Sequence, residues 1–342
     1  MAALTVSELY LACRNGDKAT VERLLSRTPL RTLNCLEPNG STCLHAASYH
    51  GHKEIVEILL RHGASRRMIN RYGCTPLDEA KTEEIARLFP RSTEAAKQRF
   101  CNNPAQQLEW QFENDSAESY SRATHWDCVK DRGIKKTIKK LRKAQAIFDD
   151  GSGSSALVAD FFQAALDTND PIYLLRAYTA ESPFYIELNR EMARGNQKEV
   201  FRKLCKKWTG FYTGLIVKNP AFEPYRFSGE TYRGMQITPV DLQQYKIGIA
   251  LANKSFQSTS KSWKVAKGFA CPSQPKPGTI PVILFFTIKD RRSALNIDQI
   301  SEYQGEEEVL IIPGTLFIIS DIDKESRPYE IHLEQLQWAD EF

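Results

Sequence analysis

The spacing of apolar positions changes along the chain. From residue 156 to about residue 217 they recur every three or four residues, which is typical of helices. After Pro224 they form continuous or alternating runs bounded by Pro and Gly, which is typical of strands. The runs predicted as strands are residues 280–288, 309–312, 316–319 and 329–333. Helices followed by strands, without regular alternation, predict an α+β fold rather than a doubly wound parallel sheet.

The first 90 residues contain an internal repeat. The segment 40–47 recurs as segment 73–80, an offset of 33 residues, with a weaker copy from Leu9 and a truncated copy at residues 75–89. This period, with two short helices per unit, resembles the ankyrin repeat and predicts a helical N-terminal array of two to three units. Its apolar positions are expected to stack units together, which leaves loop tips and the concave face for a protein partner. We interpret His45 as a structural histidine that bonds backbone in the adjacent turn.

Residues 96–155 form a connector of uncertain structure. Apolar residues at 134, 138, 141 and 148 share one helical stripe opposite a run of basic residues, which predicts an amphipathic helix. A solvated basic face is favoured over a nucleic-acid patch. Segment 151–155 is predicted to form a flexible joint or a surface turn. The predicted domains are therefore an ankyrin region at 1–95, the connector at 96–155, and a second domain at 156–342.

Composition narrows the class of protein. The chain has 342 residues, 42% hydrophobic and 26% charged, with a net charge of +4, so nucleic acid is not expected as the main partner. No stretch is typical of a signal peptide or membrane span, so we expect a cytoplasmic protein with no membrane partner. The eight cysteines lie singly, so neither a disulfide framework nor a metal site is expected. No GxGxxG or GxxxxGK[ST] motif is present, so a Rossmann dinucleotide site and ATP chemistry are not supported.

Three short segments carry candidate chemistry. They are Tyr232-Arg233-Gly234, the segment 256–260 (Phe-Gln-Ser-Thr-Ser), and the segment 306–309 (Glu-Glu-Glu-Val). Breaking the glycosidic bond of NAD releases nicotinamide and leaves a ribosyl cation. That reaction needs a fixed cation for the pyrophosphate, a hydroxyl that positions an acidic side chain, and a carboxylate beside the developing charge. Arg233, Ser258 and Glu308 would supply these groups in that order.

With these motifs, residues 156–336 resemble the mono-ADP-ribosyltransferases of the Arg-Ser-Glu class. The resemblance implies a split β-sandwich with an N-terminal helical lobe that clamps NAD as co-substrate, without metal. Because residues 227–232 alternate like a strand, we expect Arg233 at a strand end, reaching the pyrophosphate or the adjacent ribose. Tyr232 and Gly234 would complete the NAD site, with the Gly234 backbone on the nicotinamide carboxamide. Ser258 would orient Glu308, and Phe269 is a candidate platform for the nicotinamide ring.

The acidic run leads directly into an apolar strand. Because side chains two apart on a strand share a face, we expect Glu306 and Glu308 to point together and Glu307 to point away. By resemblance, Glu308 hydrogen-bonds the nicotinamide ribose and Glu306 interacts with the acceptor. Family members with Glu at both positions tend to modify arginine. A guanidinium is a poor nucleophile when charged, so a nearby carboxylate must orient it and take its proton.

The predicted activity is NAD(P)-dependent mono-ADP-ribosylation of an exposed protein arginine, with catalytic residues Arg233, Ser258, Glu306 and Glu308. One alternative is an NAD glycohydrolase, in which water is the acceptor. Another is a non-catalytic ankyrin interaction protein with an inactive NAD-binding remnant. The sequence leaves open the acceptor protein, the choice between NAD and NADP, and the role of the repeats.

Overall fold

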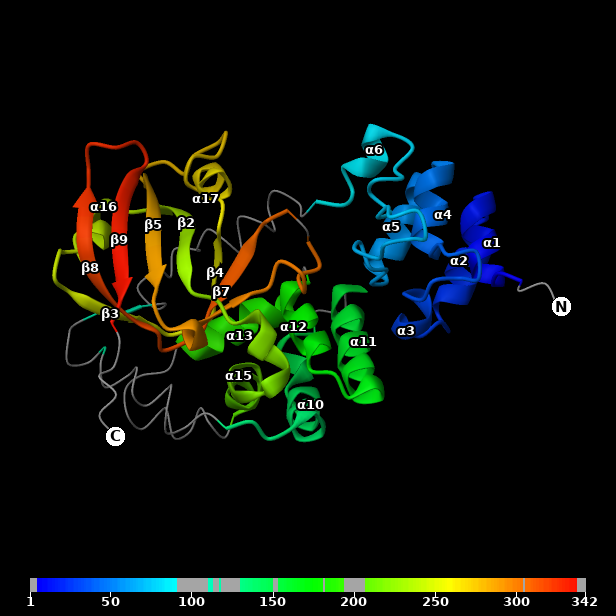
Figure 1. Cartoon of the computed structure of the whole chain (residues 1–342), viewed down its shortest axis with the longest axis horizontal. Coiled ribbons are helices and arrows are strands. Elements are labelled where there is room, and N and C mark those ends of the chain that lie inside the picture. Colours follow the sequence, from blue (N-terminus) through cyan, green and yellow to red (C-terminus); the bar gives the residue numbers. More distant parts are fainter. Residues whose placement is uncertain are drawn as a thin grey trace. The chain divides into compact units, whose positions relative to one another are not determined.

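The chain divides into two compact units. A computed structural model describes residues 5–90, 110–112, 117, 130–149, 153–180, 182–193, 207–303 and 305–336. The first unit comprises residues 1–91, 148–184 and 300–304, and the second comprises residues 92–147, 185–299 and 305–342 (Figure 1). The units interleave along the sequence, so neither is one continuous segment. The domain boundaries 1–95, 96–155 and 156–342 remain a prediction.

The described elements of the first unit are helices. The repeat helices pack as pairs, α1 against α2 and α4 against α5, and neighbouring pairs contact each other through α1 with α4 and α2 with α5. Helix α11 also packs on α3 and α5. The helices of this unit are α1 (Glu8–Asn15), α2 (Lys18–Leu25), α3 (Leu30–Leu33), α4 (Cys43–His50), α5 (Lys53–Arg61), α6 (Glu83–Ala86), α11 (Gly153–Thr168) and α12 (Ile172–Thr179).

The 33-residue period has a structural basis in two equivalent turns. Gly40 and Gly73 both adopt φ of 79°, a left-handed conformation that glycine reaches without steric cost. The Arg71 N–H of one turn donates to the Gly40 carbonyl of the preceding turn at 2.9 Å. His45 accepts from the Thr42 N–H through Nδ1 and donates from Nε2 to the Cys74 carbonyl at 3.0 Å. The structural role expected for His45 is therefore confirmed.

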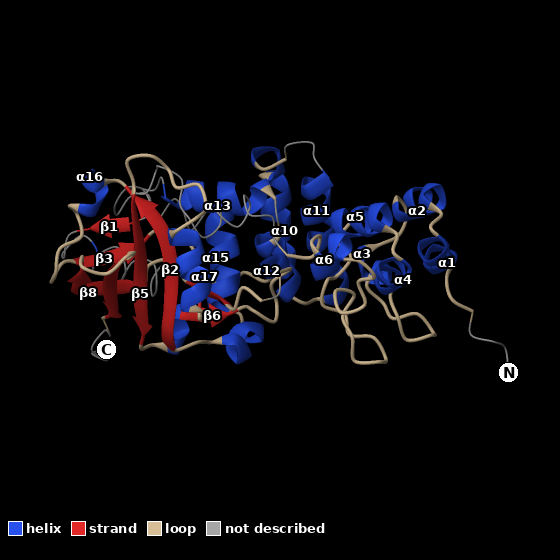
Figure 2. Cartoon of the chain, turned by 90° about the horizontal axis from the view of Figure 1, so that it is seen from above, coloured by secondary structure: helices blue, strands red, loops and turns tan. Residues whose placement is uncertain are grey.

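All described strands belong to the second unit. Figure 2 colours these strands red and the helices blue. Helix α13 (Pro183–Ala193) begins at the end of the first unit and lies mostly in the second. The other helices are α10 (Ile134–Lys143), α15 (Trp208–Lys218), α16 (Pro239–Leu242) and α17 (Trp263–Ala270), with 3-10 turns η2 (Gln145–Ile147), η3 (Pro220–Tyr225) and η4 (Arg291–Ser293). The strands are β1 (Trp110–Phe112), β2 (Gly229–Ile237), β3 (Ala250–Asn253), β4 (Gln257–Ser260), β5 (Ile280–Ile288), β6 (Ala294–Asn296), β7 (Glu308–Ile311), β8 (Leu316–Asp323) and β9 (Tyr329–Gln335).

The described strands form one sheet in the order β1-β3-β8-β9-β5-β2-β4-β7-β6. Among these pairings β5 and β9 run parallel, and the others are antiparallel. The α+β class predicted from the sequence is confirmed, and so are the four predicted strand runs, which correspond to β5, β7, β8 and β9. The sheet narrows at one place: β2 and β4 join through the single registered pair Tyr232 and Ser260, whereas β2 and β5 remain paired from Gly229 to Ile237.

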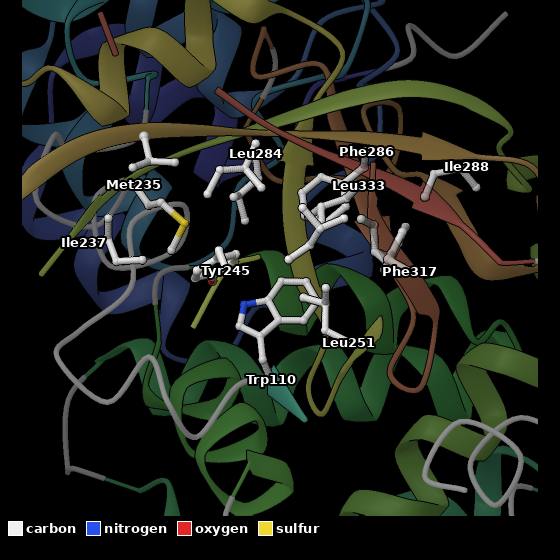
Figure 3. Packing of buried hydrophobic residues seen from close by; sticks show 14 of the residues in the cluster. Trp110, Met235, Ile237, Tyr245, Leu251, Leu284, Phe286, Ile288, Phe317 and Leu333 are labelled. Atoms are coloured by element: carbon white, nitrogen blue, oxygen red, sulfur yellow. The ribbon is translucent and has the colours of Figure 1, made fainter. Parts of the chain in front are cut away.

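A cluster of apolar side chains packs on one face of the wide part of the sheet. Trp110 of β1 points into this cluster and stacks on Phe286 with ring centroids 6.2 Å apart (Figure 3). Strand β1 pairs with β3 at the sheet edge, a contribution of the connector that the sequence did not predict. Among the described helices, none is both long and apolar enough to cross a membrane.

Candidate active site

Three neighbouring strands carry the three motifs. Tyr232 of β2 lies opposite Ser260 of β4, and Ser260 lies opposite Glu308 of β7, so these residues form one row across the sheet. Arg233 is one position from that row. Adjacent strands are about 4.8 Å apart, so the Cα atoms of Arg233 and Glu308 are separated by about two strand spacings, about 10 Å. Fold topology therefore gathers three segments that are far apart in sequence.

Arg233 lies in the middle of β2, which runs from Gly229 to Ile237, and not at a strand end as the sequence predicted. The alternating pattern continues beyond Arg233 through Met235 and Ile237, whose burial extends the strand. The Arg233 side chain is 3% exposed, and its Nη1 donates to the Ser258 carbonyl at 2.6 Å. A charge-assisted bond of this kind fixes the guanidinium beside β4.

Register alone does not decide whether Arg233 and Glu308 face a common ligand. In a continuous ladder, Tyr232 and Glu308 share a face and Arg233 points to the other. Such alternation applies within a regular ladder, and β2 and β4 share one registered pair. The contact of Arg233 with Ser258 places its cation at the strand next to β7. That Arg233 and Glu308 converge on one dinucleotide remains a prediction.

Buried hydroxyl groups join the three strands where the ladder is narrow. Thr231 Oγ1 lies 2.6 Å from Thr259 Oγ1 and 3.0 Å from the Ser260 carbonyl, and Thr259 Oγ1 donates to the Val309 carbonyl at 2.8 Å. Thr231 and Thr259 are both fully buried. Sequence reasoning missed Thr231, because its partner is known only once the pairing of β2 with β4 is known. These side chains supply cross-strand bonds where backbone pairing is reduced.

The serine motif also fixes the acidic segment. Ser260 Oγ donates to the Glu306 carbonyl at 2.7 Å and accepts from the Ser262 N–H at 3.0 Å. Ser262 is the residue before α17, and its side chain makes no capping hydrogen bond to the helix. Ser258 is 2% exposed and lies opposite Leu310. The proposed bond from Ser258 to Glu308 remains a prediction.

The three consecutive glutamates differ in environment. Glu308 opens β7 and is fully buried, Glu306 is half-buried, and Glu307 is exposed. Glu307 adopts φ of 47°, which is uncommon outside glycine, and its carbonyl accepts from the Lys261 N–H at 3.0 Å. The alternation expected across Glu306 and Glu308 does not apply, because the strand begins only at Glu308. A turn at Glu307 therefore sets the direction of Glu306.

Helix α17 covers β2 at the Tyr-Arg-Gly motif. A Cβ at Gly234 would lie 1.7 Å from the Ala266 carbonyl oxygen, so the strand and helix approach too closely for any side chain. Tyr232 donates to Glu230 at 3.1 Å, and burial together with this carboxylate raises the pKa of the Tyr232 phenol. Phe269 is a half-buried residue of α17. The structure gives Gly234 a packing role, and NAD contacts by Tyr232, Gly234 and Phe269 remain predictions.

In the part of the chain that the structure describes, no three His, Cys, Asp or Glu side chains gather as a metal site would require. Ankyrin-like helices and an α+β sheet with this row of polar residues together define an ankyrin-bearing protein of the ADP-ribosyltransferase class. The sequence matches the family model for ankyrin repeats, in three copies, at residues 9–95, and that for NAD:arginine ADP-ribosyltransferase at residues 139–339. The chain belongs to the NAD:arginine ADP-ribosyltransferase family, with N-terminal ankyrin repeats.

Individual relatives match parts of the chain. Mouse oxysterol-binding protein-related protein 1 is 40% identical over 85 residues, which are 25% of this chain and 9% of that protein. The putative NAD(+)--arginine ADP-ribosyltransferase Vis of Vibrio splendidus (strain 12B01) is 30% identical over 112 residues, 33% of this chain and 45% of that protein. The chain thus spans less than half of each. The solved Vis toxin from Vibrio splendidus aligns with 72% of this chain and 88% of its own, at 18% identity and a TM-score of 0.30.

Proposed function

We propose that the protein transfers ADP-ribose from NAD to an arginine side chain of a protein acceptor and releases nicotinamide. The observation that carries this proposal is the placement of Arg233, Ser258 and Glu308 on three neighbouring strands of the sheet. Family membership supports the use of NAD, and the family name together with the relative Vis favours arginine as the acceptor.

The reaction breaks the bond from the ribose C1′ to the nicotinamide nitrogen, and the electron pair leaves with nicotinamide. Glu308 stabilises the positive charge that develops on the ribose; because it is fully buried, this interaction acts with little screening by water. Arg233 holds the pyrophosphate, and Ser258 orients Glu308. Tyr232, Gly234 and Phe269 complete the NAD site, with the backbone of Gly234 on the carboxamide.

The second half of the reaction forms a bond from an arginine nitrogen to C1′. The nitrogen loses a proton in this step, and Glu306 accepts it. Glu306 is half-buried, and its backbone is fixed by Ser260 at 2.7 Å, so its side chain can meet both a macromolecular acceptor and the site. A carboxylate that pairs with the acceptor guanidinium also orients it for attack.

The test uses the full chain with NAD and agmatine, a small guanidine compound, and measures nicotinamide release and the ADP-ribosylated product. We expect Glu308→Gln to lower both by about 10²- to 10³-fold, because one preorganised charge is lost. Glu306→Gln should lower transfer while nicotinamide release with water continues. Glu307→Gln is the matched control, because this neighbouring side chain is exposed. The proposal fails if the parent releases no nicotinamide, or if Glu308→Gln behaves as Glu307→Gln does.

A second measurement tests the acceptor. The protein is incubated with NAD and a cell extract, and modified peptides are sequenced by mass spectrometry. ADP-ribose on arginine supports the assignment of Glu306, whereas modification confined to other residue types contradicts it.

A further inference from the structure

Residues 300–304, which precede the acidic segment, belong to the same compact unit as the ankyrin helices. Ser301, Glu302 and Tyr303 are at most 4% exposed, although they lie in a connection between strands. Loops of this kind usually lie on the surface. Their burial indicates that this connection is anchored by specific side chains.

The first anchor comes from the repeats. The guanidinium of Arg66, five residues after the end of α5, lies 4.6 Å from the centroid of the Tyr303 ring. The Nε of Arg66 is buried. A cation over an aromatic face is more strongly attracted when water is excluded. Arg66 therefore ties the second ankyrin repeat to Tyr303.

The second anchor comes from α12. Arg176 contacts Glu302 Oε1 through Nε at 2.6 Å and Nη2 at 2.5 Å, and the Glu302 side chain is 3% exposed. The Thr179 hydroxyl accepts from the Glu302 N–H at 3.1 Å and donates to the Arg176 carbonyl at 3.0 Å. Two consecutive residues of the connection, Glu302 and Tyr303, thus have separate partners.

The connection has fixed ends. The Ile297 N–H donates to the Glu308 carbonyl at 3.0 Å, and Ser260 Oγ holds the Glu306 carbonyl at 2.7 Å. Between these points no described strand supplies a ladder. Among the described residues of this connection, Glu302 and Tyr303 supply the anchoring side-chain contacts that lie just before Glu306 in sequence.

We propose that Arg66 of the ankyrin array is a positioning residue for the acceptor, acting through Tyr303 on the segment that carries Glu306. This inference rests on the proposed function, because Glu306 is assigned to the acceptor there. Arg66 itself contacts neither NAD nor the acceptor. Loss of Arg66 removes one of the contacts that hold Tyr303, broadens the conformations available to Glu306, and weakens acceptor binding without changing the residues that hold NAD.

The experiment compares Arg66→Ala, Arg66→Lys and Arg71→Ala in the full chain. Arg71→Ala is the matched control, because Arg71 also lies over a tyrosine ring in the repeats, that of the exposed Tyr72 at 4.8 Å. The measurements are the KM for agmatine in transfer, the KM for NAD in hydrolysis without acceptor, and hydrogen exchange of peptides covering residues 300–306.

We expect Arg66→Ala to raise the KM for agmatine about three- to tenfold, the range of a partly buried cation–π contact, with the KM for NAD changed less than twofold. Exchange at residues 300–306 should increase. Arg66→Lys, which keeps a cation, should restore part of the agmatine KM, and Arg71→Ala should match the parent. The inference is overturned if Arg66→Ala matches Arg71→Ala in an active enzyme, or if both KM values rise together. Absence of nicotinamide release from the parent is a different result, which overturns the proposed function and this inference with it.

Discussion

The threonine pair at the narrow part of the sheet offers a quantitative test of how the site is held. Replacing Thr259 by Val keeps the side-chain shape but removes a hydroxyl that lies 2.6 Å from Thr231 Oγ1 and donates to the Val309 carbonyl at 2.8 Å. Each net hydrogen bond contributes about 1 kcal/mol, and a buried group left without a partner costs about 1–3 kcal/mol. We expect Thr259→Val to lower the free energy of unfolding by about 2–3 kcal/mol.

Thr231→Val should lower the free energy of unfolding by less, about 1–2 kcal/mol, because it leaves the bond between Thr259 and Val309 intact. The bond between the two hydroxyls is lost in either single variant. The double variant should therefore cost about 1 kcal/mol less than the sum of the two single variants. This difference measures the coupling between β2 and β4 through side chains.

The assay is urea unfolding, monitored by hydrogen exchange of peptides from β4 and β7. These peptides report the stability of the sheet rather than that of the repeat array. Thr213→Val is a matched control, because Thr213 is also buried and, among the described residues, its hydroxyl donates to the Met192 sulfur at 3.8 Å. Because sulfur is a weak acceptor, we expect Thr213→Val to lower the free energy of unfolding by less than about 1 kcal/mol. The reasoning is refuted if Thr259→Val costs no more than Thr213→Val, or if the effects of Thr231→Val and Thr259→Val simply add.

Two further predictions follow from packing and titration. Gly234→Ala should lower the free energy of unfolding by more than about 3 kcal/mol, because its Cβ would lie 1.7 Å from the Ala266 carbonyl oxygen of α17. Gly268→Ala, on the open side of α17, should raise it by about 0.5–1 kcal/mol. Thermal unfolding measures both effects, and equal effects would contradict the packing. Burial lowers the pKa of His45, so below its unfolded value of about 6.5 the unfolded chain binds more protons, and this contribution to stability falls as pH falls. Urea unfolding of the repeats at pH 7.5 and 5.5 should show a smaller pH effect in His45→Gln than in the parent, and an unchanged pH effect would contradict this assignment.

The local pattern of apolar residues predicted helices and strands well, because the period of each element is visible in consecutive residues. The run at 280–288 became β5 with the same bounds, and the stripe from residue 134 became α10. The repeat was visible because Gly40 and Gly73 occupy equivalent left-handed turns. The gathering of the three motifs was predicted from family resemblance, since no local pattern in one sequence reveals which strands are neighbours.

What the sequence could not predict depends on long-range pairing. Residues 110–112 form a strand because they pair with the edge strand β3 and Trp110 packs in the apolar core. Three residues are too few to show a period, so the sequence did not predict this strand. The sequence predicted Arg233 at a strand end, because an arginine interrupts the apolar pattern. In the structure its bond to the Ser258 carbonyl allows the guanidinium to be buried, and the strand continues. The alternation of the glutamates failed because Glu307 turns into the left-handed region.

The narrow part of the sheet links stability to the geometry of the site. With one registered pair between β2 and β4, the bonds of Thr231, Thr259 and Arg233 replace a backbone ladder. Thr231 and Thr259 lie beside residues proposed to bind NAD, and Arg233 is itself one of those residues, so a substitution that weakens the junction also displaces the site. Activity of such variants must therefore be compared at equal folded fraction. Under that condition Thr259→Val should still lose activity, because Val309, whose carbonyl it releases, follows Glu308 directly; full activity would show that stability and site geometry are independent.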